Sequence, residues 1–356
     1  MNRREFAKRT VHTALAWALP LRLPALGNVG KKIKIAMIGT SHAHASDKLK
    51  ILLELKNLYD VIGIAGADAD RQNAAALLPA YRNLPWYDKE ALLAMADLDA
   101  VMLESSMEDI LDDAMACVRA GKHVHIDNPP GRSLPQFEQV LTAAVAGGLC
   151  FQLGYFTRYS RAVTIVKNLL DKELIGEVFE IEGVFSKKIP DARRKTIEKY
   201  YGGAMLFLGC YLIELVVSIM GRPDKTTVFR KQTRPYLDAL FDSELAVLDY
   251  RHCTAALRSS VLEIDGGERR HIIFVGTRGK VEINPFEPGR VVLTLDEPAM
   301  EFNKGKNEIG FADSTDRYTQ QLTAFAGMIH KTTPPYHTVE KELEIHRVLL
   351  TAAGYL

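Results

Sequence analysis

The chain has 356 residues, and its 45 lysines and arginines against 44 aspartates and glutamates give a formal net charge of +1. This length predicts two domains, and 47% hydrophobic with 25% charged residues is typical of a folded globular protein, not of a disordered or fibrous one. The charge balance argues against a nucleic-acid-binding protein, no apolar run is long enough for a membrane span, and the four cysteines lack the C-x-x-C spacing of a zinc cage.

The first 30 residues have the pattern of an export signal. Arg3 and Arg4 stand before Phe6 and Lys8, followed by a modestly apolar stretch and the small residues 25–27. This order resembles a bacterial twin-arginine signal, with a frayed amphipathic helix as the alternative. Removing residues 1–27 leaves 40 basic and 43 acidic residues, so the mature protein is expected to be mildly acidic and extracytoplasmic or periplasmic.

Residues 31–150 are predicted to form a dinucleotide-binding domain. Short apolar strands at 33–38, 61–65, 99–103 and 123–126 alternate with helical patterns from residue 45, around 74–78 and over 110–120. Alternation of strands and helices with short connections predicts βαβ units around a parallel sheet. Ligands of such sheets bind beyond the carboxyl ends of the strands, so the loops after each strand are the candidate site.

The loop after the first strand keeps only part of a dinucleotide-binding pattern. Gly39 holds the first glycine position of G-x-G-x-x-G, whereas Ser41 and His44 replace the other two. Asp68 follows the second strand, where an acidic side chain binds the adenosine ribose and disfavours a 2′-phosphate, so NAD is favoured over NADP. The alternative for Asp68 is a helix N-cap. We therefore assign residues of this domain to the cofactor, namely Gly39, Thr40, Ser41, His42, Asp68 and Ser105.

His42 and His44 form an H-x-H pair in the same loop. Such a pair holds a metal when both side chains point the same way, but in a loop that enters a helix we expect them to diverge. No third ligand stands nearby in the sequence, so we assign no metal. Hydrogen bonding to a pyrophosphate or substrate, or capping of the helix, remain the two open roles.

Several segments resemble the Gfo/Idh/MocA oxidoreductases, the family of glucose–fructose oxidoreductase and inositol dehydrogenase. The run AGKHVHIDNPP at 120–130 is similar to the family's A-G-K-H-V-x-x-E-K-P signature, and 202–214 aligns with its G-G-G-x-L-x-D-x-G-x-H-x-x-D segment. Smaller matches lie at 152–159, 174–178 and 276–279, so the resemblance covers residues 33–353 in order.

The resemblance implies an α/β fold with a Rossmann domain followed by an α/β domain, 151–356, that carries an open, mainly antiparallel sheet. The expected strands of that sheet are 178–186, 226–231, 244–250, 254–264, 270–276 and 279–284. One face of the sheet should stack on the Rossmann domain, and the other implies a homo-oligomer, a dimer or a tetramer. A last helix at about 339–353 should pack back on the body.

The departures from the family pattern concern its chemistry. The positions of the family's Lys, Asp, His and final Asp hold Asn128, Phe207, Tyr211 and Glu214. Asn128 cannot exchange a proton, and the ordinary pKa of a tyrosine near 10 must fall for Tyr211 to act as a base. We expect a positive neighbour such as Arg158 to lower that pKa, and Glu214, three residues later, either to couple to Tyr211 or simply to pair on its helix.

The resemblance implies the remaining site residues. Asp127 matches the glutamate expected at the nicotinamide ribose, and Tyr155, Arg158 and Lys187 are candidates for binding the substrate, Lys187 within a basic loop that fits an anionic sugar acid or is simply solvated. The favoured function is a nicotinamide-dependent oxidoreductase acting on a sugar or polyol. An enzyme that recycles its bound NAD during glycoside hydrolysis, elimination or epimerisation, and an inactive carbohydrate-binding protein, remain alternatives.

Overall fold

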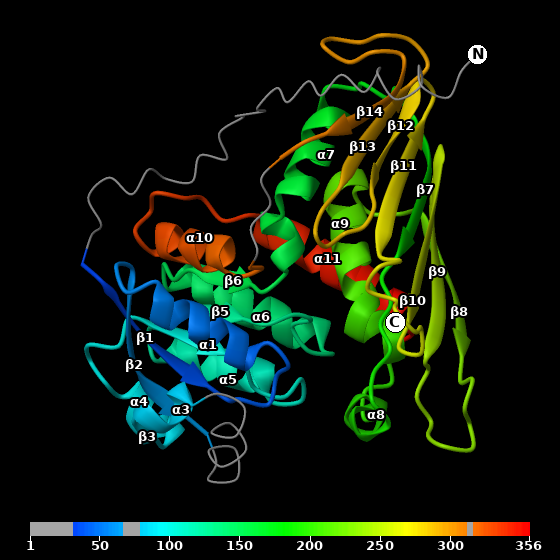
Figure 1. Cartoon of the computed structure of the whole chain (residues 1–356). Coiled ribbons are helices and arrows are strands. Elements are labelled where there is room, and N and C mark those ends of the chain that lie inside the picture. The colour runs from blue at the N-terminus through cyan, green and yellow to red at the C-terminus, as the bar shows by residue number, and fades with distance from the viewer. Residues whose placement is uncertain (1–30, 67–78, 312–315) are drawn as a thin grey trace.

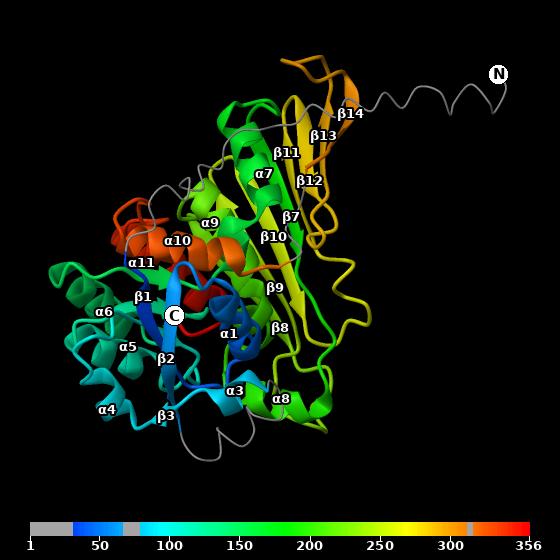
Figure 2. The ribbon, with the colours of Figure 1, turned by 60° about the vertical axis from the view of Figure 1, so that its left-hand side comes forward.

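The computed structural model describes residues 31–66, 79–311 and 316–356. The export signal predicted for residues 1–30 and the predicted ribose ligand Asp68 lie outside these residues. The described chain forms two sheets with helices between them, as Figures 1 and 2 show. None of the helices in the described ranges is long and apolar enough to cross a membrane.

The first sheet is the predicted Rossmann sheet. All its strands are parallel and follow the order β3-β2-β1-β4-β5-β6. Strands β1 and β4 are buried almost throughout, which explains their uninterrupted apolar sequences. The strands are β1 (Ile33–Ile38), β2 (Tyr59–Ala65), β3 (Trp86–Tyr87), β4 (Ala100–Leu103), β5 (His123–Ile126) and β6 (Phe151–Leu153).

Helices connect these strands and cover the sheet. The apolar faces of α1, α5 and α6 supply buried side chains such as Leu49, Ala114 and Phe137. The side chain of Ser133 caps α6 by accepting the Gln136 N–H at 3.3 Å. The helices are α1 (Ala45–Glu54), α3 (Ala80–Asn83), α4 (Lys89–Leu93), α5 (Ile110–Arg119) and α6 (Leu134–Ala146).

The Rossmann sheet ends later than the sequence predicts. We placed the domain boundary at residue 150, but β6 pairs in parallel with β5 and therefore belongs to the first sheet. The three-residue strand was missed because it lies inside the segment that resembles the opening of the second domain. After it, the 3-10 turn η2 (Phe156–Tyr159) and α7 (Arg161–Asp171) lead into the second sheet.

The second sheet has eight strands in the order β14-β13-β12-β11-β7-β10-β9-β8. Its one parallel pair is β7 with β10, and the remaining pairs are antiparallel, which confirms the predicted fold class. Strand β10 ends four residues earlier than expected, and β13 and β14 were not predicted. The strands are β7 (Val178–Val184), β8 (Lys225–Lys231), β9 (Ser243–Tyr250), β10 (Cys253–Ser260), β11 (His271–Gly276), β12 (Gly279–Ile283), β13 (Val291–Leu295) and β14 (Gly305–Ile309).

Helices fill the space between the two sheets (Figure 1). A π-helical segment at Met205–Gly209 runs directly into α9 (Cys210–Met220), which is buried along most of its length. The C-terminal helix α11 (Val339–Ala352) contacts α6 of the first unit together with α9 and β8 of the second. Helix α10 (Thr319–Ile329) contacts α1 and η2. These two helices therefore fasten the second unit to the Rossmann unit.

Candidate functional site

A cluster of charged side chains lies at the carboxyl edge of the Rossmann sheet. His42 and His44 come from the loop after β1, and Glu104 and Asp127 directly follow β4 and β5. Lys48 joins them from the first turn of α1. Lys48, Glu104 and Asp127 are fully buried. Since a buried charge is costly unless it is paired, this arrangement needs compact mutual contacts, which the structure provides.

Asp127 is the centre of the cluster. Its Oδ2 lies 2.8 Å from His42 Nδ1, 3.0 Å from His44 Nδ1 and 2.8 Å from Lys48 Nζ. Its Oδ1 accepts the backbone N–H of Asn128 at 2.7 Å. Although burial penalises the charge of Asp127, the neighbouring His42, Lys48 and His44 hold the pKa of this carboxyl well below its usual range. Asp127 is therefore a permanent carboxylate.

Lys48 connects Asp127 to further buried polar side chains. Its Nζ also lies 2.9 Å from Glu104 Oε1 and 3.0 Å from His125 Nε2. His125 Nδ1 lies 2.7 Å from Gln152 Oε1, and burial followed by repulsion from Lys48 lowers the pKa of His125 to about 3. The neutral imidazole therefore accepts from Lys48 and donates to Gln152, which fixes its tautomer.

The two loop histidines respond differently to the same carboxylate. Burial opposes the charge of His42, but Asp127 and Glu104 outweigh it and raise the pKa of His42 to about 9. For His44 burial is decisive and lowers the pKa, although Asp127 favours the charged form. Because both rings share Asp127 Oδ2, one imidazolium suffices to satisfy it, and at neutral pH His42 carries that proton.

The expectation that His42 and His44 diverge is wrong. Their ring centroids lie 4.8 Å apart, and both Nδ1 atoms face Asp127. The turn before α1 bends the loop back over the ends of β4 and β5, which the sequence spacing alone does not reveal. Sequence reasoning also missed Lys48 and Glu104. A signal for Lys48 existed, because it lies three residues after Ala45 and four before Leu52, on the apolar face of α1.

The loop after β1 fits a dinucleotide in part. Gly39 has φ +78°, and a Cβ there would lie 2.7 Å from the backbone of Ser105, so only glycine permits this turn. Thr40 and Ser41 follow in the loop that leads to the N-terminus of α1, where a pyrophosphate is favoured. The Ser105 hydroxyl donates to Asp113 Oδ2 at 2.5 Å. Asp127 already holds a contact on each oxygen, so a ribose hydroxyl would have to share or replace one.

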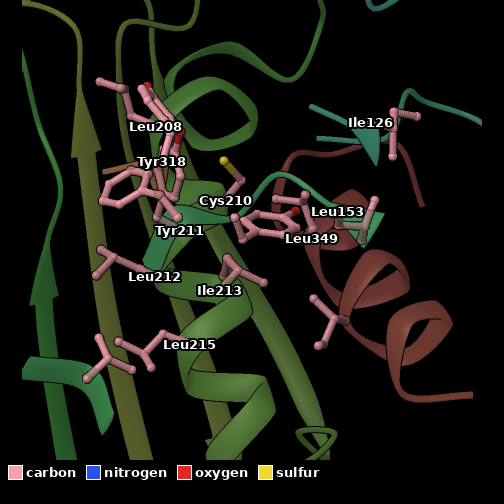
Figure 3. Close-up of a cluster of buried hydrophobic side chains, with 14 of the residues drawn as sticks. Ile126, Leu153, Leu208, Cys210, Tyr211, Leu212, Ile213, Leu215, Tyr318 and Leu349 are labelled. Atoms are coloured by element: carbon pink, nitrogen blue, oxygen red, sulfur yellow. The ribbon is translucent and has the colours of Figure 1, made fainter. Parts of the chain in front are cut away.

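Asn128 and Tyr211 meet where α9 approaches β5. The Asn128 amide satisfies both of its groups when its nitrogen donates to Gly154 O at 2.8 Å and Asp127 Oδ1 at 3.0 Å. Cys210 Sγ lies 3.5 Å from the same amide. Figure 3 shows Cys210 and Tyr211 at the start of α9, with Tyr318 beside them. Asn128 therefore contacts Asp127, and Tyr211 interacts with both residues. The catalytic roles of Asn128 and Tyr211 stay predictions.

The ionisation predicted for Tyr211 is wrong. Its ring is enclosed by Tyr155, Phe156 and Phe185, with centroids 4.9–6.1 Å away, and only 5% of the residue is exposed. Burial, reinforced by Cys210 and Asp127, raises the pKa of Tyr211 well above its usual value. Tyr211 is therefore a neutral phenol, suited to donating a hydrogen bond and not to acting as a base.

Arg158 and Glu214 are joined in a buried ion cluster. Arg158 Nε donates to Glu214 Oε1 at 2.9 Å, and its two terminal nitrogens bind Glu342 at 2.5 and 2.7 Å. Burial opposes this charge, but Glu342 and Glu214 outweigh it and raise the pKa of Arg158. The guanidinium also stacks 5.0 Å from the Tyr155 ring. The side chain of Arg158 is thus committed to connecting η2, α9 and α11.

Lys187 lies in a cluster of cations beside Tyr211. Burial, followed by repulsion from Arg193, Arg270 and Arg317, lowers the pKa of Lys187. Arg270 and Arg317 also interact electrostatically with Tyr211, and both pair with Glu287. Their guanidinium groups stack on Phe185 and Phe156, the same rings that enclose Tyr211. The four cationic side chains and the single carboxylate of Glu287 therefore give this cluster a net positive charge.

Two matches to known families cover most of the chain. Residues 33–155 match the "Oxidoreductase family, NAD-binding Rossmann fold", and residues 163–282 match the "GFO/IDH/MocA C-terminal domain". The chain belongs to the Gfo/Idh/MocA oxidoreductases. The resemblance inferred from the motifs at 120–130 and 202–214 is confirmed, and with it the assignment to an NAD(P)-dependent oxidoreductase family.

Relatives within the Gfo/Idh/MocA oxidoreductases are distant. Trans-1,2-dihydrobenzene-1,2-diol dehydrogenase of Xenopus laevis is 22% identical over 72% of this chain and 77% of its own. D-xylose 1-dehydrogenase (NADP(+)) 2 of Haloferax volcanii is 25% identical over 82% and 88%. Among solved structures, the 3-ketoreductase KijD10 of Actinomadura kijaniata, in complex with TDP-benzene and NADP, has a TM-score of 0.72 at 21% identity, covering 89% and 96%. This last similarity shows the shared fold.

Proposed function

We propose that this protein is a nicotinamide-dependent oxidoreductase whose substrate is a sugar derivative carrying an acidic group. The observation that supports an acidic substrate is the cluster of cations beside Tyr211, which consists of Lys187, Arg193, Arg270 and Arg317. A carboxylate bound there would relieve the mutual repulsion of these cations and form charge-assisted hydrogen bonds. The reaction would be hydride transfer between a carbon of the substrate and the cofactor.

Tyr211, positioned by Asn128, would hold the reacting oxygen of the substrate. The nicotinamide supplies or accepts the hydride when it is bound. The neutral phenol of Tyr211 is a hydrogen-bond donor that would stabilise partial negative charge on a carbonyl oxygen. Asn128, whose amide nitrogen already donates to Gly154 and Asp127, would position the Tyr211 hydroxyl. This pair replaces the family's acid/base set, in which a lysine and a histidine transfer the proton. It therefore fits carbonyl reduction better than alcohol oxidation.

The decisive assay is oxidation of NADH or NADPH by purified protein with a panel of keto-sugar acids and their neutral counterparts. We expect turnover with acids and little with neutral sugars. Nucleotide that stays bound and is not consumed during conversion of substrate would indicate internally recycled NAD. Binding of sugars without turnover or nucleotide would indicate the carbohydrate-binding alternative.

Replacing Lys187 with glutamine is expected to raise the KM for an acidic substrate about 10-fold or more, because one charge-assisted contact contributes about 1.5–3 kcal/mol. The substitution should leave kcat nearly unchanged, since Lys187 lies outside the hydride-transfer geometry. Steady-state kinetics measure both constants, and Lys188→Gln, which changes the adjacent exposed lysine, is the matched control. An unchanged KM in Lys187→Gln would remove this residue from the substrate site.

The choice between the two nicotinamide cofactors rests on Asp68. We propose NAD, because a carboxylate at the end of the second strand binds the adenosine ribose and repels a 2′-phosphate. Asp68→Ala is expected to weaken NAD binding more than NADP binding, as measured by calorimetry. Wild-type protein that binds NADP tenfold more tightly, a difference of about 1.4 kcal/mol, would contradict this role and favour the alternative cofactor.

We also propose that the protein is exported through the twin-arginine route. The support is the Arg3-Arg4 pair together with the mildly acidic remainder of the chain. Replacing both arginines with lysine is expected to leave folded protein in the cytoplasm, which fractionation and immunoblotting would detect. Undiminished secretion of that variant would refute the proposal, whereas a single Arg9→Lys change serves as the control.

Oligomerisation through the second sheet is the final part of the proposal. The face of this sheet turned away from α9 includes Phe229, which is 54% exposed, and partly exposed Leu245 and Val247. An apolar open face of this kind is typically covered by a second copy. Light scattering at micromolar concentration is expected to give the mass of a dimer or tetramer, and Phe229→Lys should shift it toward the monomer.

A further inference from the structure

We propose that His42, His44, Asp127 and Glu104 form a binding site for one divalent transition-metal cation of the zinc class. The proposal concerns the cluster at the carboxyl edge of β1, β4 and β5 and does not depend on the nature of the substrate or on hydride transfer. It rests on the distances between the candidate ligand atoms and on a buried carboxylate oxygen of Glu104 that accepts no hydrogen bond from the described residues.

The spacing of the candidate ligand atoms is that of a small tetrahedral site. One ligand atom each from His42, His44 and Asp127 lies within 4.8 Å of the other two. His42 Nδ1 and Asp127 Oδ2 are 2.8 Å apart, and His44 Nδ1 and Asp127 Oδ2 are 3.0 Å apart. Four ligands about 2.0–2.1 Å from zinc at tetrahedral angles lie roughly 3.3 Å from one another. A few tenths of an ångström of expansion would therefore admit the ion.

Glu104 supplies the second, independent observation. The residue is fully buried, and its Oε2 has no hydrogen-bond partner among the described residues, although Oε1 is bound by Lys48 at 2.9 Å. This oxygen forms a 3.4 Å ion pair with His42 Nδ1, itself a candidate ligand. A buried carboxylate oxygen without a donor is costly, and a cation between Glu104 and His42 would satisfy it.

The donor set selects the kind of ion. Two imidazole nitrogens with carboxylate oxygens suit Zn²⁺ and Co²⁺, whereas Mg²⁺ and Ca²⁺ prefer all-oxygen sites. The site is also reachable, because the side chains of His42 and His44 are 22% and 18% exposed while both carboxylates are buried behind them. An ion would therefore enter from the histidine side and be held by the carboxylates.

Lys48 stands behind the candidate site as a built-in counter-charge. Its ammonium contacts Asp127 Oδ2, Glu104 Oε1 and His125 Nε2, so it holds both carboxylates in place. Because His42 carries a proton at neutral pH, an incoming divalent ion must displace that proton, after which two carboxylates and one ammonium give the site a net charge of −1. The ammonium lowers the affinity through repulsion but fixes the carboxylates in place, as outer-shell partners do in known metal sites.

The test uses the full chain, purified without nucleotide, dialysed against a chelator and then titrated with ZnCl₂ and CoCl₂ by calorimetry. We expect one equivalent of ion per chain and visible Co²⁺ absorption typical of a tetrahedral centre. His42→Gln and His44→Gln should each lower the affinity at least about 100-fold, more than loss of an outer-shell partner costs. His252→Gln, which changes an exposed histidine outside the cluster, should bind as the wild type does. No saturable binding, or unchanged affinity in the His42→Gln/His44→Gln double variant, would overturn the proposal.

A second measurement on the wild-type protein does not depend on the folding of variants. X-ray absorption of the zinc-loaded chain should show two imidazole ligands and an oxygen shell at about 2.0–2.1 Å. A spectrum without imidazole scattering, or with a thiolate ligand, would place the ion elsewhere and refute the assignment. Because neither measurement involves turnover, a failed search for an oxidoreductase substrate would leave this result unaffected.

Discussion

Replacing Arg158 with methionine is expected to lower the free energy of unfolding by about 3–5 kcal/mol, the range observed when one partner is removed from a buried ion pair. The guanidinium is fully enclosed and bridges Glu214 and Glu342, which come from α9 and α11. Without it, two buried carboxylates would lose the guanidinium that they share, and Glu214 would keep its interactions with His337 and Lys167. Urea unfolding followed by circular dichroism measures the difference.

Arg290→Met is the matched control for Arg158→Met. Arg290 also makes two contacts to one carboxylate, that of Glu308, but both side chains are largely exposed. Exposed pairs contribute little, so this control should unfold close to the wild type. Adding Glu214→Gln and Glu342→Gln to Arg158→Met should recover part of the loss. A change below about 1 kcal/mol in Arg158→Met would show that the cluster does not stabilise the fold.

His346→Leu is expected to stabilise the protein, and to do so most strongly in mild acid. His346 is 1% exposed on α11, its ring packs 5.0 Å from that of Phe137, and neither of its nitrogens has a hydrogen-bond partner within the described residues. An unpaired buried polar group costs about 1–3 kcal/mol, and leucine has a similar size and no such group. The gain should therefore be visible already at pH 7.

Acid enlarges the effect of His346 for a definite reason. Burial lowers the pKa of His346 from 6.5 to about 3, so the native chain cannot take up the proton that the unfolded chain binds. Stability is therefore complete above pH 6.5 and falls as the pH drops toward 3, by about 2 kcal/mol at pH 5. His346→Leu should remove this pH-dependent loss of stability, and His252→Leu should not. Parallel pH profiles for wild type and His346→Leu would contradict the prediction.

The order of strands and helices could be predicted because short-range sequence patterns indicate where each element lies. Apolar strands, glycine stops and the spacing of family motifs located every strand of the Rossmann sheet except the two-residue β3 and the three-residue β6. Strands β13 and β14 were missed because the last strand expected from the family resemblance ended at residue 284, and both of these strands lie beyond it. Sequence reasoning thus missed the very short strands and those outside the matched motifs.

Residues of the candidate site could be predicted only where their position in a sequence motif was enough to suggest a role. Gly39, Asn128 and Tyr211 were identified from their places in motifs, and the last two interact in the folded chain. The partners of Arg158 and Lys48 were not predictable, because they lie 56 and 184 residues from Arg158 and 56 to 79 residues from Lys48 along the chain. Ionisation of Tyr211 likewise depends on rings that only the folded chain assembles.

The position of α11 has a consequence for the order in which the chain matures. This helix is synthesised some 200 residues after α6, yet it packs against α6 and supplies the Glu342 carboxylate that pairs with Arg158. While the ribosome still holds residues 339–352, α6 and α9 lack the helix that packs on both of them, and Arg158 lacks its bidentate partner. Completion of the fold therefore waits until α11 has left the ribosome, and a nascent chain stalled before Val339 should be recognised by chaperones and proteases as unfinished.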